Sequence, residues 1–173
     1  MKRKVLVLVV VLILLGLLVQ SVSFADPINY SDVVHQLVVS WNQNVSRDEL
    51  TKLYGEPLYE TETYLSFWDA EKSTQYTFFF SDQRLTHIDV TCGPFSKENW
   101  SYSYNQYTDT LDKLGETLGE RQGVMLFYNG DERTASDVDC YISSWSGNGI
   151  DVLVTYNQTD TQVSVFTKIM AAR

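Results

Sequence analysis

Two side chains that could do acid–base chemistry, His87 and Asp89, lie two residues apart in a stretch rich in β-branched and aromatic residues. Residues i and i+2 of a β-strand point to the same face, so both are expected side by side on a sheet. A histidine next to a carboxylate is part of a Ser/His/Asp triad, but no nucleophile is singled out here. The alternative is that His87 is an exposed residue of the sheet. We therefore predict no catalytic residue.

The chain also lacks the short motifs of common enzyme classes. It has no Gly-x-Ser-x-Gly elbow, no His-Glu-x-x-His pair, no phosphate-binding glycine loop and no dinucleotide fingerprint. We expect a protein that is not an enzyme.

Aromatic residues are in excess, at 13% of the chain, so some are expected outside the core. Most aromatic side chains are buried, but Tyr64, Trp68 and Phe79 are expected on the exposed face of a sheet, where such a patch marks a protein interface. A shift of one residue in register would bury them instead. A second aromatic cluster, in residues 100–107, is the motive for an alternative function in carbohydrate binding.

Oxygen and sulfur ligands for a metal are present but poorly spaced. Asp131, Glu132, Asp137 and Asp139 could hold calcium, yet they lack the spacing of a known calcium loop and fit a solvated hairpin loop better. The two histidines and two cysteines likewise lack the spacing of a zinc site. The sequence predicts no metal and no cofactor.

The N-terminus is typical of a secretory signal peptide. Three basic residues at 2–4 precede an apolar run from Val5 to Val19, and Ser23-Phe24-Ala25 provides a small-x-small cleavage site. The run is shorter than the roughly 18 residues that a membrane-spanning helix needs, although a retained anchor is the alternative. We predict that residues 1–25 are removed and that residues 26–173 form one secreted, periplasmic or cell-envelope domain without a stable membrane anchor.

The composition limits the possible partners. The formal net charge is −9, and removal of the three basic residues of the leader makes it −12. Nucleic acid and anionic membrane surfaces would repel such a chain. We expect another extracytoplasmic protein as the partner, with a basic surface, whereas the alternative is that the carboxylates only keep the protein soluble.

Cys92 and Cys140 are the two cysteines of the chain. In an oxidising compartment an even pair predicts a disulfide, which would stabilise the fold by about 4 kcal/mol for a loop of about 49 residues. Two buried reduced thiols are the alternative.

The side chains above must be positioned by a fold of helices followed by strands. Ser46 and Glu49 form a capping box at the start of a short helix, and Gly55 and Pro57 end it. Ser31-Asp32 is expected to cap an earlier helix. A third helix is expected to start at residues 103–106 and to end at Gly119.

The strand candidates alternate with period two. They are residues 61–68, 75–81, 84–91, 123–128, 138–146, 150–156 and 162–168, with turn signals at Asn129-Gly130 and Asn148-Gly149 and a break at Cys92-Gly93-Pro94. We predict an α+β fold in which helices pack on one face of an antiparallel sheet and the other face is open. Residues 31–91 and 103–168 are possible tandem repeats.

The helix pair, followed by Leu53-Tyr54-Gly55-Glu56-Pro57, Trp68, Tyr76-Thr77-Phe78-Phe79-Phe80 and Arg84-Leu85-Thr86-His87-Ile88, resembles the α-α-β-β pattern of the SmpA/OmlA (BamE-like) outer-membrane assembly proteins. It is also similar to the beta-lactamase inhibitory protein superfamily, in which two such units occur in tandem. The resemblance implies a protein that works by binding other proteins, often through the sheet. The chain lacks the lipobox cysteine of the first family and the cysteine pattern of the second.

These observations lead to one main hypothesis and one alternative. The main hypothesis is an exported, non-catalytic protein-binding domain that uses Tyr64, Trp68, Phe79, His87 and Asp89 on the open sheet face, in envelope assembly or in inhibition of a partner. The alternative is a secreted protein that binds or hydrolyses carbohydrate or cell wall.

Overall fold

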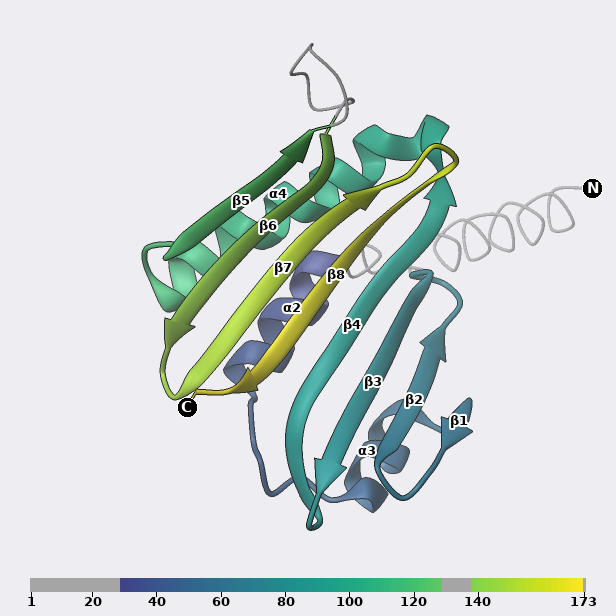
Figure 1. The fold of residues 1–173 in the computed structure, drawn as a ribbon. Helices are drawn as coiled ribbons and strands as arrows, with labels where there is room; N and C mark the ends of the chain where they lie inside the picture. The colour runs from purple at the N-terminus through teal and green to yellow at the C-terminus, as the bar shows by residue number, and fades with distance from the viewer. Residues whose placement is uncertain (1–28, 129–137, 173) are drawn as a thin grey trace, which may run out of the picture.

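A computed structural model describes residues 29–128 and 138–172. Its described residues form three α-helices and one eight-stranded antiparallel sheet, in the strand order β1-β2-β3-β4-β8-β7-β6-β5 (Figure 1). The helices are α2 (Tyr30–Val39), α3 (Arg47–Tyr54) and α4 (Trp100–Leu118), with a 3-10 turn η1 (Lys97–Asn99) before α4. The strands are β1 (Tyr59–Glu60), β2 (Tyr64–Asp69), β3 (Thr74–Ser81), β4 (Arg84–Ser96), β5 (Gly123–Tyr128), β6 (Val138–Gly147), β7 (Ile150–Gln158) and β8 (Gln162–Ala171).

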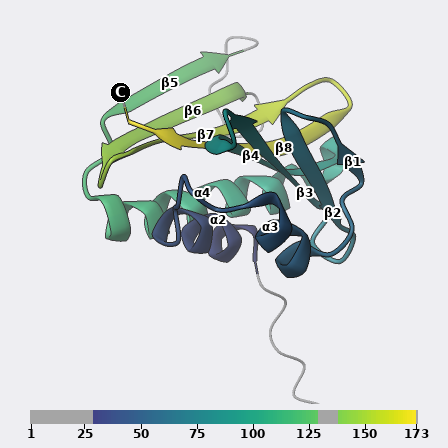
Figure 2. The ribbon, with the colours of Figure 1, turned by 90° about the horizontal axis from the view of Figure 1, so that it is seen from below.

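All three helices lie on the same side of the sheet (Figure 2). No described helix covers the other side, which we call the open face. This arrangement confirms the predicted α+β fold with helices on one face of an antiparallel sheet. The predicted signal peptide, the Asn129-Gly130 turn and most of the acidic stretch at 131–139 lie outside the described residues.

Local sequence explains where the helices begin and end. Around α3, the Ser46 backbone N–H donates to Glu49 Oε2 at 2.8 Å and Ser46 Oγ accepts from the Glu49 N–H at 3.2 Å, so the predicted capping box is confirmed. The start of α2 was predicted one to two residues late, because Asn29 and not Ser31 precedes the first turn; its N–H donates to Asp32 at 3.3 Å.

Helix α4 is also longer than predicted at its start. It begins at Trp100 after Asn99, because the 3-10 turn η1 leads directly into it and the Asn99 side chain makes no capping hydrogen bond. Its end at Leu118 agrees with the prediction, and Gly119 has φ 83° and ψ −150°. That region of backbone space is open essentially to glycine alone.

The sheet continues past a point where the sequence predicts a break. Strand β4 runs on to Ser96 through Cys92-Gly93-Pro94, with a cis Gly93–Pro94 bond and a shift of register between Cys92 and Phe95. A bulge absorbs the proline, which cannot donate to a neighbouring strand. Beyond the bulge, Phe95 pairs with Val163 and Ser96 with Gln162 of β8.

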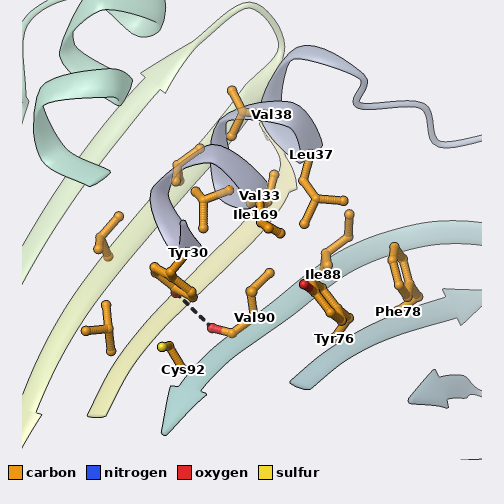
Figure 3. Packing of buried hydrophobic residues seen from close by; sticks show 14 of the residues in the cluster. Tyr30, Val33, Leu37, Val38, Tyr76, Phe78, Ile88, Val90, Cys92 and Ile169 are labelled. Atoms are coloured by element: carbon orange, nitrogen blue, oxygen red, sulfur yellow. Dashed lines mark hydrogen bonds between the residues drawn. The ribbon is translucent and has the colours of Figure 1, made fainter. Parts of the chain in front are cut away.

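The two halves of the chain have the same order of elements. Helices α2 and α3 precede the meander β1–β4, and α4 precedes the meander β5–β8, so the last strands of the two halves, β4 and β8, pair at the centre of the sheet. The helix-facing side chains of β3, β4 and β8 lie beneath α2 (Figure 3). Tyr30 of α2 reaches into this layer, where its hydroxyl donates to the Val90 carbonyl at 3.1 Å and lies 2.7 Å from Thr167 Oγ1.

The predicted disulfide between Cys92 and Cys140 is wrong: the structure has no bond between them. Cys92 lies on β4 and Cys140 on β6, and β8 and β7 separate these strands. Three strand spacings of about 4.8 Å each put the two far beyond the reach of a disulfide. They also belong to opposite faces, since Cys92 is buried on the helix side while Cys140 alternates with Tyr141, whose partner Tyr156 is buried there.

Candidate functional site

The open face is built from rows of residues that pair directly across neighbouring strands. The first row runs through β2, β3, β4 and β8 and consists of Tyr64, Phe79, His87 and Met170. It contains three of the five predicted site residues. The next row is Ser66, Thr77, Asp89 and Lys168, and the third is Trp68, Gln75, Thr91 and Phe166. The structure therefore brings Tyr64, Trp68, Phe79, His87 and Asp89 to one face, spread over three adjacent rows.

The first row is a ladder of rings, which we call the aromatic ladder and define as Tyr64, Phe79 and His87. The Tyr64 and Phe79 ring centroids are 5.8 Å apart, and the Phe79 and His87 rings stack at 4.2 Å with an angle of 9° between their planes. All three side chains are half-buried. The ladder is thus packed by contacts between its own members, with Phe79 between the other two rings, and each side chain keeps part of its surface exposed.

A bulge sets the position of His87 at the end of the ladder. The register shifts between Phe79 and Phe80, so that Phe79 pairs with His87 and Phe80 with Leu85, and Thr86 is the extra residue. The Thr86 hydroxyl donates to the Phe79 carbonyl at 3.0 Å and lies 3.1 Å from His87 Nδ1. The bulge keeps Leu85 in the core and His87 on the open face.

Beside the ladder lies a polar centre. Asp89 Oδ1 is 3.5 Å from Lys168 Nζ, an ion pair without a hydrogen bond. Ser66 Oγ accepts from the Gln75 amide at 2.8 Å and lies 3.2 Å from Thr77 Oγ1. Aromatic surface next to polar groups that are already positioned is the composition of a protein-recognition surface.

The surroundings of His87 do not resemble those of a general base. Burial lowers the pKa of His87, and the positive charge of Lys168 lowers it further, while Asp89 acts in the opposite direction. Among the described residues no hydrogen bond joins Asp89 to His87, and the carboxylate pairs with Lys168 instead. The geometry of a Ser/His/Asp relay is therefore missing from this part of the sheet.

Trp68 differs from the rest of the predicted site in its exposure. It is 48% exposed at the end of β2, where β1 no longer pairs, because β1 faces only Leu65 and Ser66. Trp68 is thus the most accessible of the predicted site residues, at a corner of the open face.

The second aromatic cluster, residues 100–107, is mostly part of the core. Tyr107 is buried, and its ring lies 5.8 Å from Tyr141 and 6.1 Å from Tyr156. Tyr104 packs against the same two rings, and only Tyr102 is largely exposed. The cluster holds α4 on the sheet and does not form a surface platform for a glycan.

The sequence matches no protein-family model and no curated protein. Among solved structures, the crystal structure of a DUF4309 family protein (YjgB) from Bacillus subtilis subsp. subtilis str. 168 is similar over 73% of this chain and 78% of that chain, with a TM-score of 0.41 and 13% sequence identity. This likeness is too distant to assign a family or a function. The resemblance to BamE-like proteins and to the beta-lactamase inhibitory protein stays a prediction.

No group of three or more His, Cys, Asp or Glu side chains lies close enough together to hold a metal ion within residues 29–128 and 138–172. Over the same residues, none of the helices is long and apolar enough to cross a membrane.

The structure reveals one feature that sequence reasoning missed, a cavity between α2, α3 and the hairpin that joins β2 to β3. Tyr54 and Tyr76 line it together with the charged pair Asp69 and Lys72. Period two puts Tyr76 on the face of β3 opposite Phe79, and the available signal for the cavity was its hydroxyl, which a buried tyrosine must satisfy.

Proposed function

We propose that this protein is an exported, non-catalytic binding domain that holds another protein against its open sheet face. The observation that carries the proposal is the one-sided packing of α2, α3 and α4, which leaves the aromatic ladder and Trp68 on a broad face without a described covering element. Large aromatic side chains with restricted motion supply much of the binding energy at protein interfaces.

The charge of the chain supports a partner with a basic surface. The formal net charge is −9 for the whole chain, and Lys168 on the open face is already paired with Asp89. An excess of negative charge speeds encounter with a positively charged partner and disfavours acidic ones. The role would be envelope assembly or inhibition of the partner, as the resemblance implies.

The proposal is tested by photo-crosslinking with benzoylphenylalanine at position 68, using envelope and culture-medium extracts. Position 102 is a matched control, because Tyr102 and Trp68 are both 48% exposed, while Tyr102 lies on α4 and not on the open face. We expect one defined partner to be crosslinked from position 68 and not from position 102.

The Tyr64→Ala/Trp68→Ala protein should then lose capture of that partner while the Tyr102→Ala protein retains it. Unfolding curves of the wild-type protein and of both variants show whether the fold is intact. Equal capture by the wild-type protein and a folded double mutant would disprove the role of the open face.

A further inference from the structure

The cavity on the helix side of the sheet has the size of a small-molecule site. Its volume is about 610 Å³, within the roughly 300–1,000 Å³ typical of ligand pockets. Helix α2 and the Ser40 that follows it provide four residues of its lining, among them Gln36, and α3 provides Leu53 and Tyr54. The β2–β3 hairpin provides the other six. The cavity lies on the side of the sheet opposite the aromatic ladder, and Trp68, at the end of β2, is the one residue of the predicted open-face site that also lines it.

Aromatic rings form one wall of this cavity. The Tyr54 ring lies 5.4 Å from Phe67 and 5.3 Å from Tyr76, measured between centroids. Leu53, next to Tyr54 on α3, is 72% exposed in spite of its apolar side chain. Apolar and aromatic surface that remains accessible beside a cavity favours a ligand with an apolar face.

Two hydroxyl groups of this wall lack partners. Neither Tyr54 nor Tyr76 makes a hydrogen bond through its hydroxyl with any residue that the structure describes, although Tyr76 is only 3% exposed. Burial raises the pKa of Tyr76, and the neighbouring charges of Asp69 and Tyr54 raise it further, so its hydroxyl stays protonated and can donate. Neither hydroxyl is among the fully enclosed atoms without a partner, so both can be reached by a molecule in the cavity that bonds to them.

The charged groups of the cavity neutralise each other. Lys72 Nζ lies 2.5 Å from Asp69 Oδ2. Burial acts to raise the pKa of Asp69, but the hydrogen bonds from Lys72 and from the backbone outweigh it, and the pKa lies below its ordinary value. The pair is therefore ionised on both sides with no net charge, which favours an uncharged ligand.

The remaining polar groups both donate and accept hydrogen bonds. The Gln36 amide, the Ser40 hydroxyl and the two tyrosine hydroxyls all belong to this class. The Ser40 hydroxyl donates to the Gln36 carbonyl at 2.6 Å and so keeps lone pairs that can accept. A ligand with several neighbouring hydroxyl groups matches such a set.

We propose that this cavity binds a neutral saccharide unit, whose C–H face packs on the ring of Tyr54 and whose hydroxyl groups bond to Tyr54, Tyr76 and the Asp69–Lys72 pair. The cavity offers an aromatic ring for stacking, several hydroxyl groups and no net charge. Together these features favour a sugar over a fatty acid or a charged metabolite. This site would bind carbohydrate, as in the alternative function suggested by the composition, but with residues outside the 100–107 cluster.

The test uses the full purified protein and five neutral trisaccharides: N,N′,N″-triacetylchitotriose, cellotriose, maltotriose, xylotriose and mannotriose. Binding is measured by saturation-transfer-difference NMR and calorimetry. We expect at least one of them to bind with a dissociation constant of about 1 mM or tighter. Tyr54→Phe and Tyr76→Phe should each weaken that binding about three- to tenfold, because each removes one hydrogen bond.

A matched control is Tyr102→Phe, which removes the hydroxyl of an exposed tyrosine outside the cavity and should leave binding unchanged. Tyr76→Phe should keep or raise the midpoint of urea unfolding, since the hydroxyl it removes has no partner among the described residues. If Tyr76 were needed only for folding, Tyr76→Phe would instead lower that midpoint.

Three results would overturn the proposal. They are the absence of binding by all five sugars at that affinity, unchanged binding in the Tyr54→Phe/Tyr76→Phe protein, and saturable binding of decanoate in place of any sugar.

Discussion

Among the described residues of the open face, His87 is the one whose charge changes near neutral pH, and its neighbours decide the direction in which its pKa shifts. Burial and the ammonium group of Lys168 both lower its pKa, and the Asp89 carboxylate only partly compensates. The stacked position against Phe79 favours the neutral ring for the same reason, because burial disfavours the charged form. The open face therefore presents a neutral imidazole at pH 7.

NMR titration of the two histidines should show a pKa for His87 below its ordinary value of 6.5. Because the unfolded chain then binds the proton more tightly than the folded protein, the free energy of unfolding should fall as the pH drops through and below 6.5. Lys168→Met should raise the pKa of His87, since it removes a positive charge and leaves Asp89 unpaired. Lys97→Met, in η1 just after the far end of β4, is the control and should leave this pKa unchanged.

Ser46 tests how much one cap contributes. Ser46→Ala should lower the free energy of unfolding by about 1 kcal/mol, because the Glu49 N–H loses its acceptor. Ser46→Asp should restore most of that loss, since aspartate accepts the same hydrogen bond. Urea denaturation measures both. If Ser46→Ala left the free energy of unfolding unchanged, this would show that α3 is held by the packing of Leu50 alone.

At the scale of elements, α4 offers two glycines with opposite requirements. Gly115 lies inside the helix with open space around it, and Gly119 follows its last turn at φ 83° and ψ −150°. An alanine fits the helix better than glycine, but it cannot easily adopt the backbone of Gly119.

Gly115→Ala should therefore raise the free energy of unfolding by about 1 kcal/mol. Gly119→Ala should lower it by about 1–3 kcal/mol, although nothing lies within 4 Å of the added methyl group. Urea denaturation followed by circular dichroism gives both values. Equal effects of the two substitutions would contradict the assignment of the cost to backbone conformation.

The elements that the sequence predicted well are those with a local signal. Strand alternation put Phe79, His87 and Asp89 on the open face, and the register agrees, because Tyr76 and Phe78 on the opposite face of β3 are buried. Asn148-Gly149 forms the predicted hairpin turn, with φ values of 54° and 78°. Both signals lie within a few residues of the feature they predict.

The misses have a non-local cause. The sequence around Pro94 indicates a break, but β4 continues because Phe95 and Ser96 find partners on β8, far along the chain. The cavity was not predictable for the same reason, since it depends on how α2 and α3 sit over the β2–β3 hairpin. The five predicted site residues share the open face, as period two alone predicted. Their role in binding stays a prediction.

At the scale of the whole molecule, strand order decides what the two cysteines can do. The sequence shows an even number of cysteines, but it does not show that two strands, β8 and β7, lie between β4 and β6. Cys92 is buried on the helix side, and burial raises the pKa of its thiol to about 11. A thiol of that kind is a core residue and a poor nucleophile.

We expect the intact mass of the protein to correspond to two thiols, and the urea midpoint to be the same with and without dithiothreitol. Cys92 should resist alkylation by iodoacetamide at pH 8 in the folded protein and react after unfolding. A fall of the midpoint on reduction would show a disulfide and contradict this strand order.

The pairing of β4 with β8 also has a consequence for how the chain matures. β8 is the last described strand to be synthesised, yet it fills the middle of the sheet, where His87 meets Met170 and Ser96 meets Gln162. Until it emerges from the ribosome, the 13-residue strand β4 has one uncovered edge to which any extended peptide could add. We therefore expect the nascent chain to be prone to wrong strand pairing until β8 is made.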